Sequence, residues 1–590
     1  MAAGILRAAV RQINPTFIAA SAVIYVIAFV VAWWLGRGGG QLLQRANAAE
    51  RGWRRALVAL ALVYFAAYAY LSVQRYNKLL CSTYDLAIFD SLYYNALGGK
   101  LFTDYRGPFD HFEPLYLALV PFYALWRDAR LLLVLQSAIF SLAAWPLYLA
   151  AAEVSGRKTV GAAVAILYLL YPLVGEANLY DYHTMSLSPL CFFTMLYFMV
   201  KKNWRWYWVS LALVLLVKES EAILVFGAGL YLLSKKEYAK GAITSALAVA
   251  WFFSATTLVL PAVTGRSFRQ FGRYGGLDVV FERVVSSPGG YYEALGYGAK
   301  TLSVMLFTLA PLGFLCARRW RALVFVYGPT FAVHMTSRVF FQNVIFGHYA
   351  ITMASAALGA AALAVDAPKG FSEDERPSAL PVFLVIVAVL SNLAFSFPAN
   401  ERYIYAKVNL EMKRSWNLLS LPLPMTAERR DFYRTTPRER LFFAVRDAIP
   451  RGSSVAGLSR FTVYFANGYK VRAARLGASP DYYLFDLKTT PESVWPVRNE
   501  YPFEAPHTAS GDTVGDKSAL YEPFAKSPDY VRLIDLTTPE DGGFLFFAKK
   551  DKWRAVYDNL LAAEKRDPAD EGVRLALAAV ERTAERRKAP

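Results

Sequence analysis

Apolar runs long enough to cross a bilayer recur along the first two thirds of the chain. The first extends from Pro15 to Leu35, and others lie at 56–74, 131–152 and 241–263. A run of about 18 or more uncharged residues is the length at which a helix spans the hydrocarbon core. The chain is also 56% hydrophobic, with a mean hydropathy of +0.28, which is too apolar for an ordinary soluble protein. The sequence therefore predicts an all-α polytopic membrane domain.

Basic residues are concentrated in short loops between the apolar runs. Such loops follow residues 35, 200, 234 and 317, and the loops that alternate with them are less basic. Because short basic loops stay on the cytoplasmic side, this alternation predicts about twelve membrane passes, with both termini outside. The first run lacks a small-residue cleavage site, so we expect it to be a retained helix. These loops account for much of the net charge of +18, and we expect no nucleic-acid partner.

The composition changes after residue 397, which divides the chain into three expected parts. Residues 1–397 form the membrane domain, whose outer loops are 76–130, 177–186, 264–300 and 337–349. Short apolar strands alternate with turn residues in 398–550, which predicts a small α/β extracytoplasmic domain. Residues 551–590 read as a charged helical tail. All three cysteines precede residue 317, so the tail contains no disulfide framework, and no CxxC motif occurs.

The polar segment that follows the second apolar run is the first candidate site. Carboxylates and imidazoles gather there and in the loop at 177–186: Asp85, Asp90, Asp110, His111 and Glu113, then Asp181 and His183. In an extended stretch, side chains two positions apart share a side, so His111 pairs with Glu113 and Asp181 with His183. Such pairs suit a divalent cation or a general base. No spacing matches a zinc motif, so a metal stays open, as does plain hydrogen-bonded loop packing.

Basic residues on the expected outer side form a second set. They are Lys218 within the charged tetrad 218–221, Arg266, Arg269, Arg273, Arg338 and His348. A guanidinium binds phosphate with two parallel hydrogen bonds, so these residues are candidates for holding a phosphate. A solvated basic loop is the alternative interpretation.

Two stretches carry a resemblance to a known family. YDLAIFDSLYYNALGG at 84–99 and DHFEPLYLALVPFYALW at 110–126 resemble a family of archaeal and bacterial polytopic membrane proteins of unassigned function. That family is similar to the GT-C glycosyltransferase superfamily, whose members take sugars from polyprenyl phosphates on the outer face of the membrane. The resemblance implies Asp85 as the catalytic base and Asp181 as a second-loop acid. Two features depart from the GT-C pattern: the extra span at 15–35, and the absence of a clean DxD motif.

The expected function is therefore sugar transfer from a polyprenyl-phosphate-linked donor to a glycan, lipid or protein acceptor. The expected location is the outer face of the cytoplasmic membrane, within the lipid bilayer. No P-loop and no GxGxxG motif occurs, which fits a donor that needs no nucleotide site. Two alternatives remain: a transporter or flippase of an amphiphilic lipid, and a non-catalytic protein of cell-surface assembly.

Overall fold

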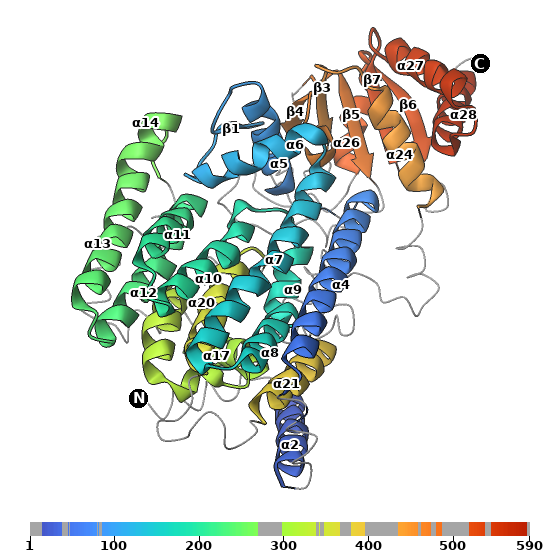
Figure 1. Cartoon of the computed structure of the whole chain (residues 1–590). Coiled ribbons are helices and arrows are strands. Elements are labelled where there is room, and N and C mark those ends of the chain that lie inside the picture. Colours follow the sequence, from blue (N-terminus) through green and yellow to red (C-terminus); the bar gives the residue numbers. More distant parts are fainter. Residues whose placement is uncertain are drawn as a thin grey trace. The chain divides into compact units, whose positions relative to one another are not determined.

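The computed structural model divides the chain into two compact units (Figure 1). It describes residues 15–37, 45, 48–79, 81, 85–268, 298–337, 342, 347–365, 379–395, 435–457, 462–473, 479–486, 518–536 and 544–586. The first unit comprises Met1–Ser72, Pro108–Leu125 and Leu131–Leu410, and the second comprises Val73–Gly107, Trp126–Arg130 and Glu411–Pro590. Each is described by itself below.

The first unit is built from helices. In chain order these are α2 (Pro15–Arg37), most of α4 (Glu50–Asn77), α7 (Ala129–Ser155), α8 (Lys158–Leu169), α9 (Pro172–Leu179), α10 (Leu187–Val200), α11 (Trp204–Val217), α12 (Ala222–Ser234), α13 (Tyr238–Ser254), α14 (Leu260–Thr264), α17 (Gly298–Leu309), α18 (Gly328–Thr336), α20 (Tyr349–Ala362) and α21 (Leu380–Phe395). Single-turn π-helices precede α14 and α18. α20 packs against α9 and α10, and α21 packs against α2 and α8.

Three of the described helices are long and apolar enough to cross a membrane: Glu50–Asn77, Ala129–Ser155 and Tyr238–Thr264. A fourth span results if α8 and α9, which bend by 44° at their junction, are counted together. The other apolar helical stretches that the structure describes have 10–17 residues, among them Ala19–Leu35 within α2. The described residues thus contain three or four candidate membrane spans, and the expected count of about twelve is not supported.

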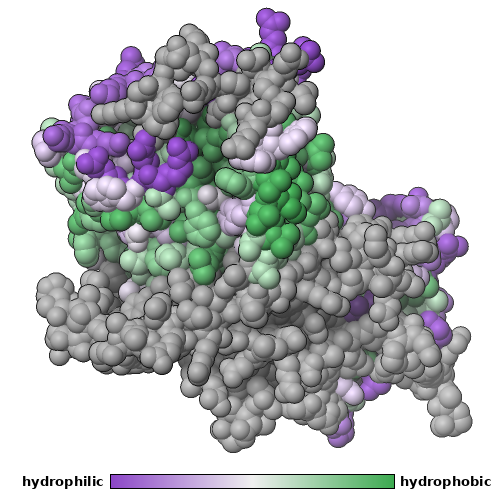
Figure 2. Space-filling view, turned by 90° about the horizontal axis from the view of Figure 1, so that it is seen from below, coloured by the Kyte–Doolittle hydropathy of each residue, from purple (hydrophilic) through white to green (hydrophobic). Residues whose placement is uncertain are grey.

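Large hydrophobic side chains on these helices are exposed. On the helix that includes α13 and α14, Leu258 is 66% exposed and Ile243 49%, and α2 and α4 carry similar residues. Figure 2 shows such a hydrophobic patch beside hydrophilic residues on the face seen from below. Lipid-facing surfaces of a membrane bundle have this character, since lipid tails are as apolar as the side chains.

Glycines bring α12 against its neighbours. A Cβ atom placed on Gly229 would lie 2.7 Å from the backbone nitrogen of Ser245 on α13, and one on Gly227 would lie 2.7 Å from the carbonyl oxygen of Phe325. Real Cβ atoms do not approach backbone atoms this closely. Small residues that let backbones meet are a common means of joining helices in membranes, where helix association gains little from the hydrophobic effect.

The second unit contains a five-stranded sheet in the order β4-β3-β5-β7-β6. The strands are β3 (Ser454–Gly457), β4 (Lys470–Ala473), β5 (Tyr482–Asp486), β6 (Tyr530–Leu536) and β7 (Phe544–Lys549). β3 is parallel to β4 and β5, whereas β7 is antiparallel to β5 and β6. Its helices are α5 (Asp85–Leu97), α24 (Pro437–Ala448), α25 (Thr462–Phe465), α26 (Ser518–Ala525), α27 (Trp553–Arg566) and α28 (Glu571–Arg586). The small α/β region and the two charged C-terminal helices expected from the sequence are confirmed.

The C-terminal end of α4 and the residues after it contact the sheet-containing part of this unit. The ring of Tyr76 lies 4.7 Å from that of Tyr464, and the Tyr464 hydroxyl donates a hydrogen bond to the Tyr76 carbonyl at 2.8 Å. Lys78 forms an ion pair of 2.9 Å with Glu439, whose carboxylate also completes the capping box of α24 with Thr436. These contacts explain why residues 73–107, which begin in the last turns of α4, belong to the second unit.

The close approach of α12 and α13 predicts a specific cost for a methyl group at Gly229. A glycine-to-alanine change inside a helix ordinarily stabilises it by about 0.5–1 kcal/mol. For Gly229→Ala we expect the opposite, a lower thermal midpoint, because two of the atoms that the methyl group would contact, besides the Ser245 hydroxyl oxygen, are backbone atoms and cannot move aside. Gly52→Ala on α4, where the added atom meets only the Ala49 Cβ at 3.7 Å, serves as the control. Equal midpoints for the two variants in purified protein would contradict the close packing.

Candidate functional site

The charged tetrad Lys218 to Glu221 interrupts two apolar helices of the first unit. Helix α11 ends when Lys218 adopts an extended conformation, with φ −165° and ψ 149°, and a 3-10 turn over Glu219–Glu221 leads into α12. All of its charged side chains are buried: Lys218 is 7% exposed, Glu219 1% and Glu221 0%. Buried charges of this kind are costly in a membrane protein and mark functional positions.

The segment before the short 3-10 helix Pro114–Leu119 supplies the partners of the tetrad. His111 Nδ1 lies 2.7 Å from Glu219 Oε1, and Lys218 Nζ lies 2.8 Å from Glu113 Oε1. His111 and Glu113 therefore both contact the tetrad, although the chain bends at 110–111 and is not a regular extended stretch there. The structure places each of them with a residue of the tetrad.

Glu219 is held in its ionised form by these contacts. Burial alone would raise the pKa of Glu219, but the neighbouring His111 and Lys218 outweigh it, and the net pKa is lowered. Glu221 differs, because burial raises its pKa. Its carboxylate accepts hydrogen bonds from the hydroxyl of Ser188 and from that of Thr352 at 2.7 Å. The pKa values of two acids in one turn are thus shifted in opposite directions.

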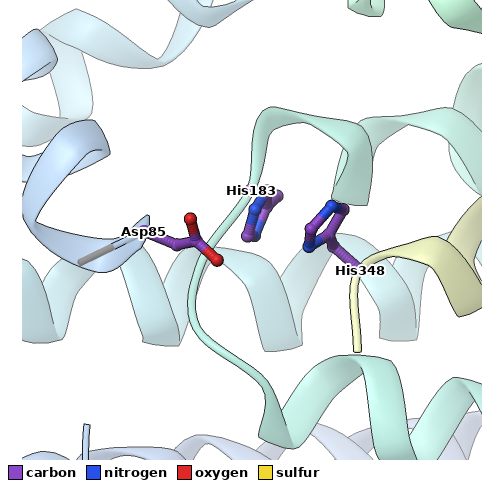
Figure 3. A group of neighbouring side chains, drawn as sticks. All are labelled: Asp85, His183 and His348. Atoms are coloured by element: carbon purple, nitrogen blue, oxygen red, sulfur yellow. The ribbon is translucent and has the colours of Figure 1, made fainter. Parts of the chain in front are cut away.

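His183 and His348 lie together in the same unit, where Figure 3 shows their rings facing each other. The ring centroids are 4.0 Å apart and the planes differ by 20°. His183 Nδ1 lies 3.0 Å from the carbonyl oxygen of Asp181, so the proton-bearing nitrogen is Nδ1. Burial lowers the pKa of His183 to about 3, and the ring is neutral at pH 7. Asp85, also labelled in Figure 3, belongs to the second unit.

The turn that carries His183 is fixed by a buried amide network. Gln136 on α7 accepts the backbone N–H of His183 at 3.1 Å and donates to the Tyr180 carbonyl at 3.2 Å. Asn178, at the end of the bent helix pair, accepts from Ser137 at 3.0 Å and donates to the Tyr64 hydroxyl at 3.1 Å. This network positions the turn 180–183 precisely without any charged group.

Several buried polar atoms near this turn lack a hydrogen-bond partner among the described residues. They include the hydroxyls of Thr184 and Ser186, both 0% exposed. Glu113 Oε2 likewise lacks a hydrogen-bond partner among the described residues, although Oε1 of the same carboxylate is paired with Lys218. Buried polar atoms are nearly always satisfied in proteins, so such a group points to water or a ligand.

The other residues singled out in the sequence are placed as follows. Asp181 is 2% exposed in the turn 180–183, and Arg266 follows α14, where its N–H donates to Thr264 at 3.3 Å. In the second unit, Asp85 is the half-buried first residue of α5, and Asp90 on the same helix is 2% exposed. Asp110 is half-buried beside His111 in the first unit. Arg269, Arg273 and Arg338 lie outside the described residues.

Glu219 and Glu221 are the site residues that sequence reasoning left out of its candidate set. The available signal was the tetrad itself, since three ionisable groups within four residues between apolar runs are expensive unless they are used or paired. The hydrogen-bonding partners Ser188, Thr352 and Gln136 carried no such signal, because a single neutral polar residue in an apolar run is common.

Comparison with known proteins identifies the family. No curated protein matches the chain. A family model described as predicted membrane protein (DUF2079) matches residues 75–495, a range that includes the tetrad, its partners and the two stacked histidines. The chain belongs to this DUF2079 family of membrane proteins.

Proposed function

We propose that this protein is a membrane glycosyltransferase that uses a polyprenyl-phosphate-linked sugar and acts at the outer face of the cytoplasmic membrane. The observation that supports it best is the buried ionic cluster, formed by the pairs His111–Glu219 and Lys218–Glu113. It lies where the apolar helices α11 and α12 are interrupted.

Sugar transfer from a lipid phosphate needs few protein groups. The phosphate is already a leaving group, so the enzyme must accept a proton from the acceptor hydroxyl and stabilise the negative charge that develops on the departing phosphate. A cluster of acids, an ammonium and imidazoles in a water-poor environment can supply both, since electrostatic effects are strengthened where water is excluded.

The roles implied by the resemblance form part of this proposal. Asp85 is the base, Asp181 a second acid, and Lys218 and His348, with the arginines at 266, 269, 273 and 338, bind the donor phosphate. A divalent metal remains open, with carboxylates and imidazoles as its ligands. The residues from 398 to 550 are assigned to the extracytoplasmic side in this scheme.

A second candidate, a transporter or flippase of an amphiphilic lipid, has one observation in its favour. Glu221 is fully buried between α11 and α12, and burial raises its pKa, which is a property of acids that take up and release protons during transport. The two candidates differ in their products. A transferase forms a new glycosidic bond and releases polyprenyl phosphate, whereas a flippase changes only the leaflet in which a lipid resides.

Replacing the Lys218–Glu113 pair by apolar residues separates function from stability. Lys218→Met alone leaves a buried carboxylate without its counter-ion, which costs about 3–5 kcal/mol. The double variant Lys218→Met with Glu113→Leu removes both charges, so we expect its thermal midpoint to return most of the way to the wild-type value. We also expect it to release no polyprenyl phosphate in assays with polyprenyl-phosphate donors that carry different hexoses. The half-exposed pair Lys240–Glu237, also at 3.0 Å, provides a control when replaced in the same way. Full activity in the stable double variant would show that the cluster is structural.

Asp85→Asn tests the proposed base. The amide keeps the shape of the side chain but cannot accept a proton, so we expect the rate of sugar transfer to fall by roughly 10²–10⁴ with little change in the melting temperature. Asp551→Asn, at a side chain that is 69% exposed in the same unit, should retain the wild-type rate. A wild-type rate for Asp85→Asn would remove Asp85 from the mechanism.

A further inference from the structure

The carboxylate of Glu219 holds His111 by two contacts at once. Its Oε1 lies 2.7 Å from His111 Nδ1, and its Oε2 accepts the backbone N–H of Phe112 at 2.9 Å. The backbone contact fixes the orientation of the carboxylate, and the carboxylate in turn fixes the plane of the imidazole. An ionised carboxylate accepts hydrogen bonds and cannot donate them, so Nδ1 carries a proton.

The other nitrogen of this imidazole is left for a ligand. Within the described part of the chain, His111 Nε2 has no hydrogen-bond partner. The His111 side chain is 18% exposed, whereas that of its partner Glu219 is only 2% exposed. The ring edge is supported by Phe109, whose centroid lies 5.9 Å away. Among the described residues, His111 does not belong to a group of three or more metal-type side chains. The geometry therefore suits proton transfer better than metal binding.

Glu219 is the carboxylate that contacts this ring at Nδ1. Lys218 is paired with Glu113 at 2.8 Å, and His183, which interacts with both pairs, is kept neutral by burial, which lowers its pKa to about 3. An ionised carboxylate in hydrogen-bond contact stabilises the imidazolium form of a histidine. Protonated, the ring would donate one N–H to Glu219 and present the other at Nε2.

We propose that His111, positioned by Glu219, donates a hydrogen bond and then a proton from Nε2 to the leaving phosphate of a polyprenyl monophosphate donor. This inference rests on the proposed function and names how its site recognises the donor. In the reaction, the acceptor oxygen forms a bond to the anomeric carbon as the bond from that carbon to the phosphate oxygen breaks. The phosphate keeps the electron pair and takes the proton of His111, while the proton of the acceptor hydroxyl passes to a carboxylate that acts as the base. Exchange with water then returns both groups to their starting forms.

The charge of the phosphate changes during the reaction. A phosphate monoester carries a charge of about −1.5 to −2 at pH 7, whereas the phosphodiester of the donor carries one negative charge. Only the product is a monoester dianion, so the contact strengthens as the bond to the sugar breaks, which is the condition for catalysis.

Binding of the phosphate can be tested without any sugar transfer. Full-length protein with ¹⁵N-labelled histidine is placed in lipid nanodiscs, and its His111 signals are assigned by their loss in His111→Gln. Adding a polyprenyl monophosphate should shift the Nε2 resonance of His111, whereas a polyprenol of the same length should not. Glu219→Gln should reduce this shift at least several-fold, and Glu153→Gln, at a 42% exposed side chain, should leave it intact. No shift, or an equal shift with the alcohol, would overturn the proposal, and the wild-type spectra alone decide this if Glu219→Gln does not fold.

The catalytic part of the inference is read from the pH profile. If imidazolium is the proton donor, kcat of the wild type should fall on the alkaline side, and His111→Gln should lower kcat about 10²-fold and remove that limb, with a smaller effect on KM. A retained alkaline limb in an active His111→Gln enzyme contradicts the role of His111. Absence of transfer by the wild type from every donor, together with a phosphate-specific shift, would instead reject the proposed glycosyltransferase while keeping the phosphate site.

Discussion

The pairing of charges between residues 111–113 and 218–219 is the constraint on which the interior of the first unit depends. Each of these residues contacts one on the other segment, with His111 against Glu219 and Lys218 against Glu113. Removing a single member would strand a buried charge at a cost of several kcal/mol. The helix break at the tetrad and the segment before Pro114 therefore stabilise each other, although about a hundred residues separate them in the sequence.

Much of this arrangement was accessible from the sequence, and the reasons are physical. A tetrad such as KESE cannot stay inside an apolar helix without a cost, so the break between 217 and 222 was predictable. The spacing of His111 and Glu113 suggested that they act together, and both contact the tetrad. Which residues they would contact was not predictable, because carboxylates at 176, 219 and 221 are equivalent by type, and only packing selects among them.

The fold was predicted at the level of class and less well in detail. The helices at 50–77 and 129–155 follow directly from long apolar runs, and the small sheet follows from short runs separated by turn residues. The expected number of spans is not supported by the described residues, and hydropathy does not show where a helix bends or ends, as at the junction of α8 and α9. The resemblance implied Asp85 and Asp181 as a catalytic pair. These two residues belong to different units, so their joint role stays a prediction.

Because residues 73–107 and 126–130 belong with the sheet, the chain passes between the two units at 72/73, 107/108, 125/126, 130/131 and 410/411. The sheet unit is thus a discontinuous domain. A fragment that begins after residue 410 would lack the lysine that pairs with Glu439 and the tyrosine ring that contacts Tyr464. The sheet unit therefore cannot be obtained complete by expressing the C-terminal part of the chain alone.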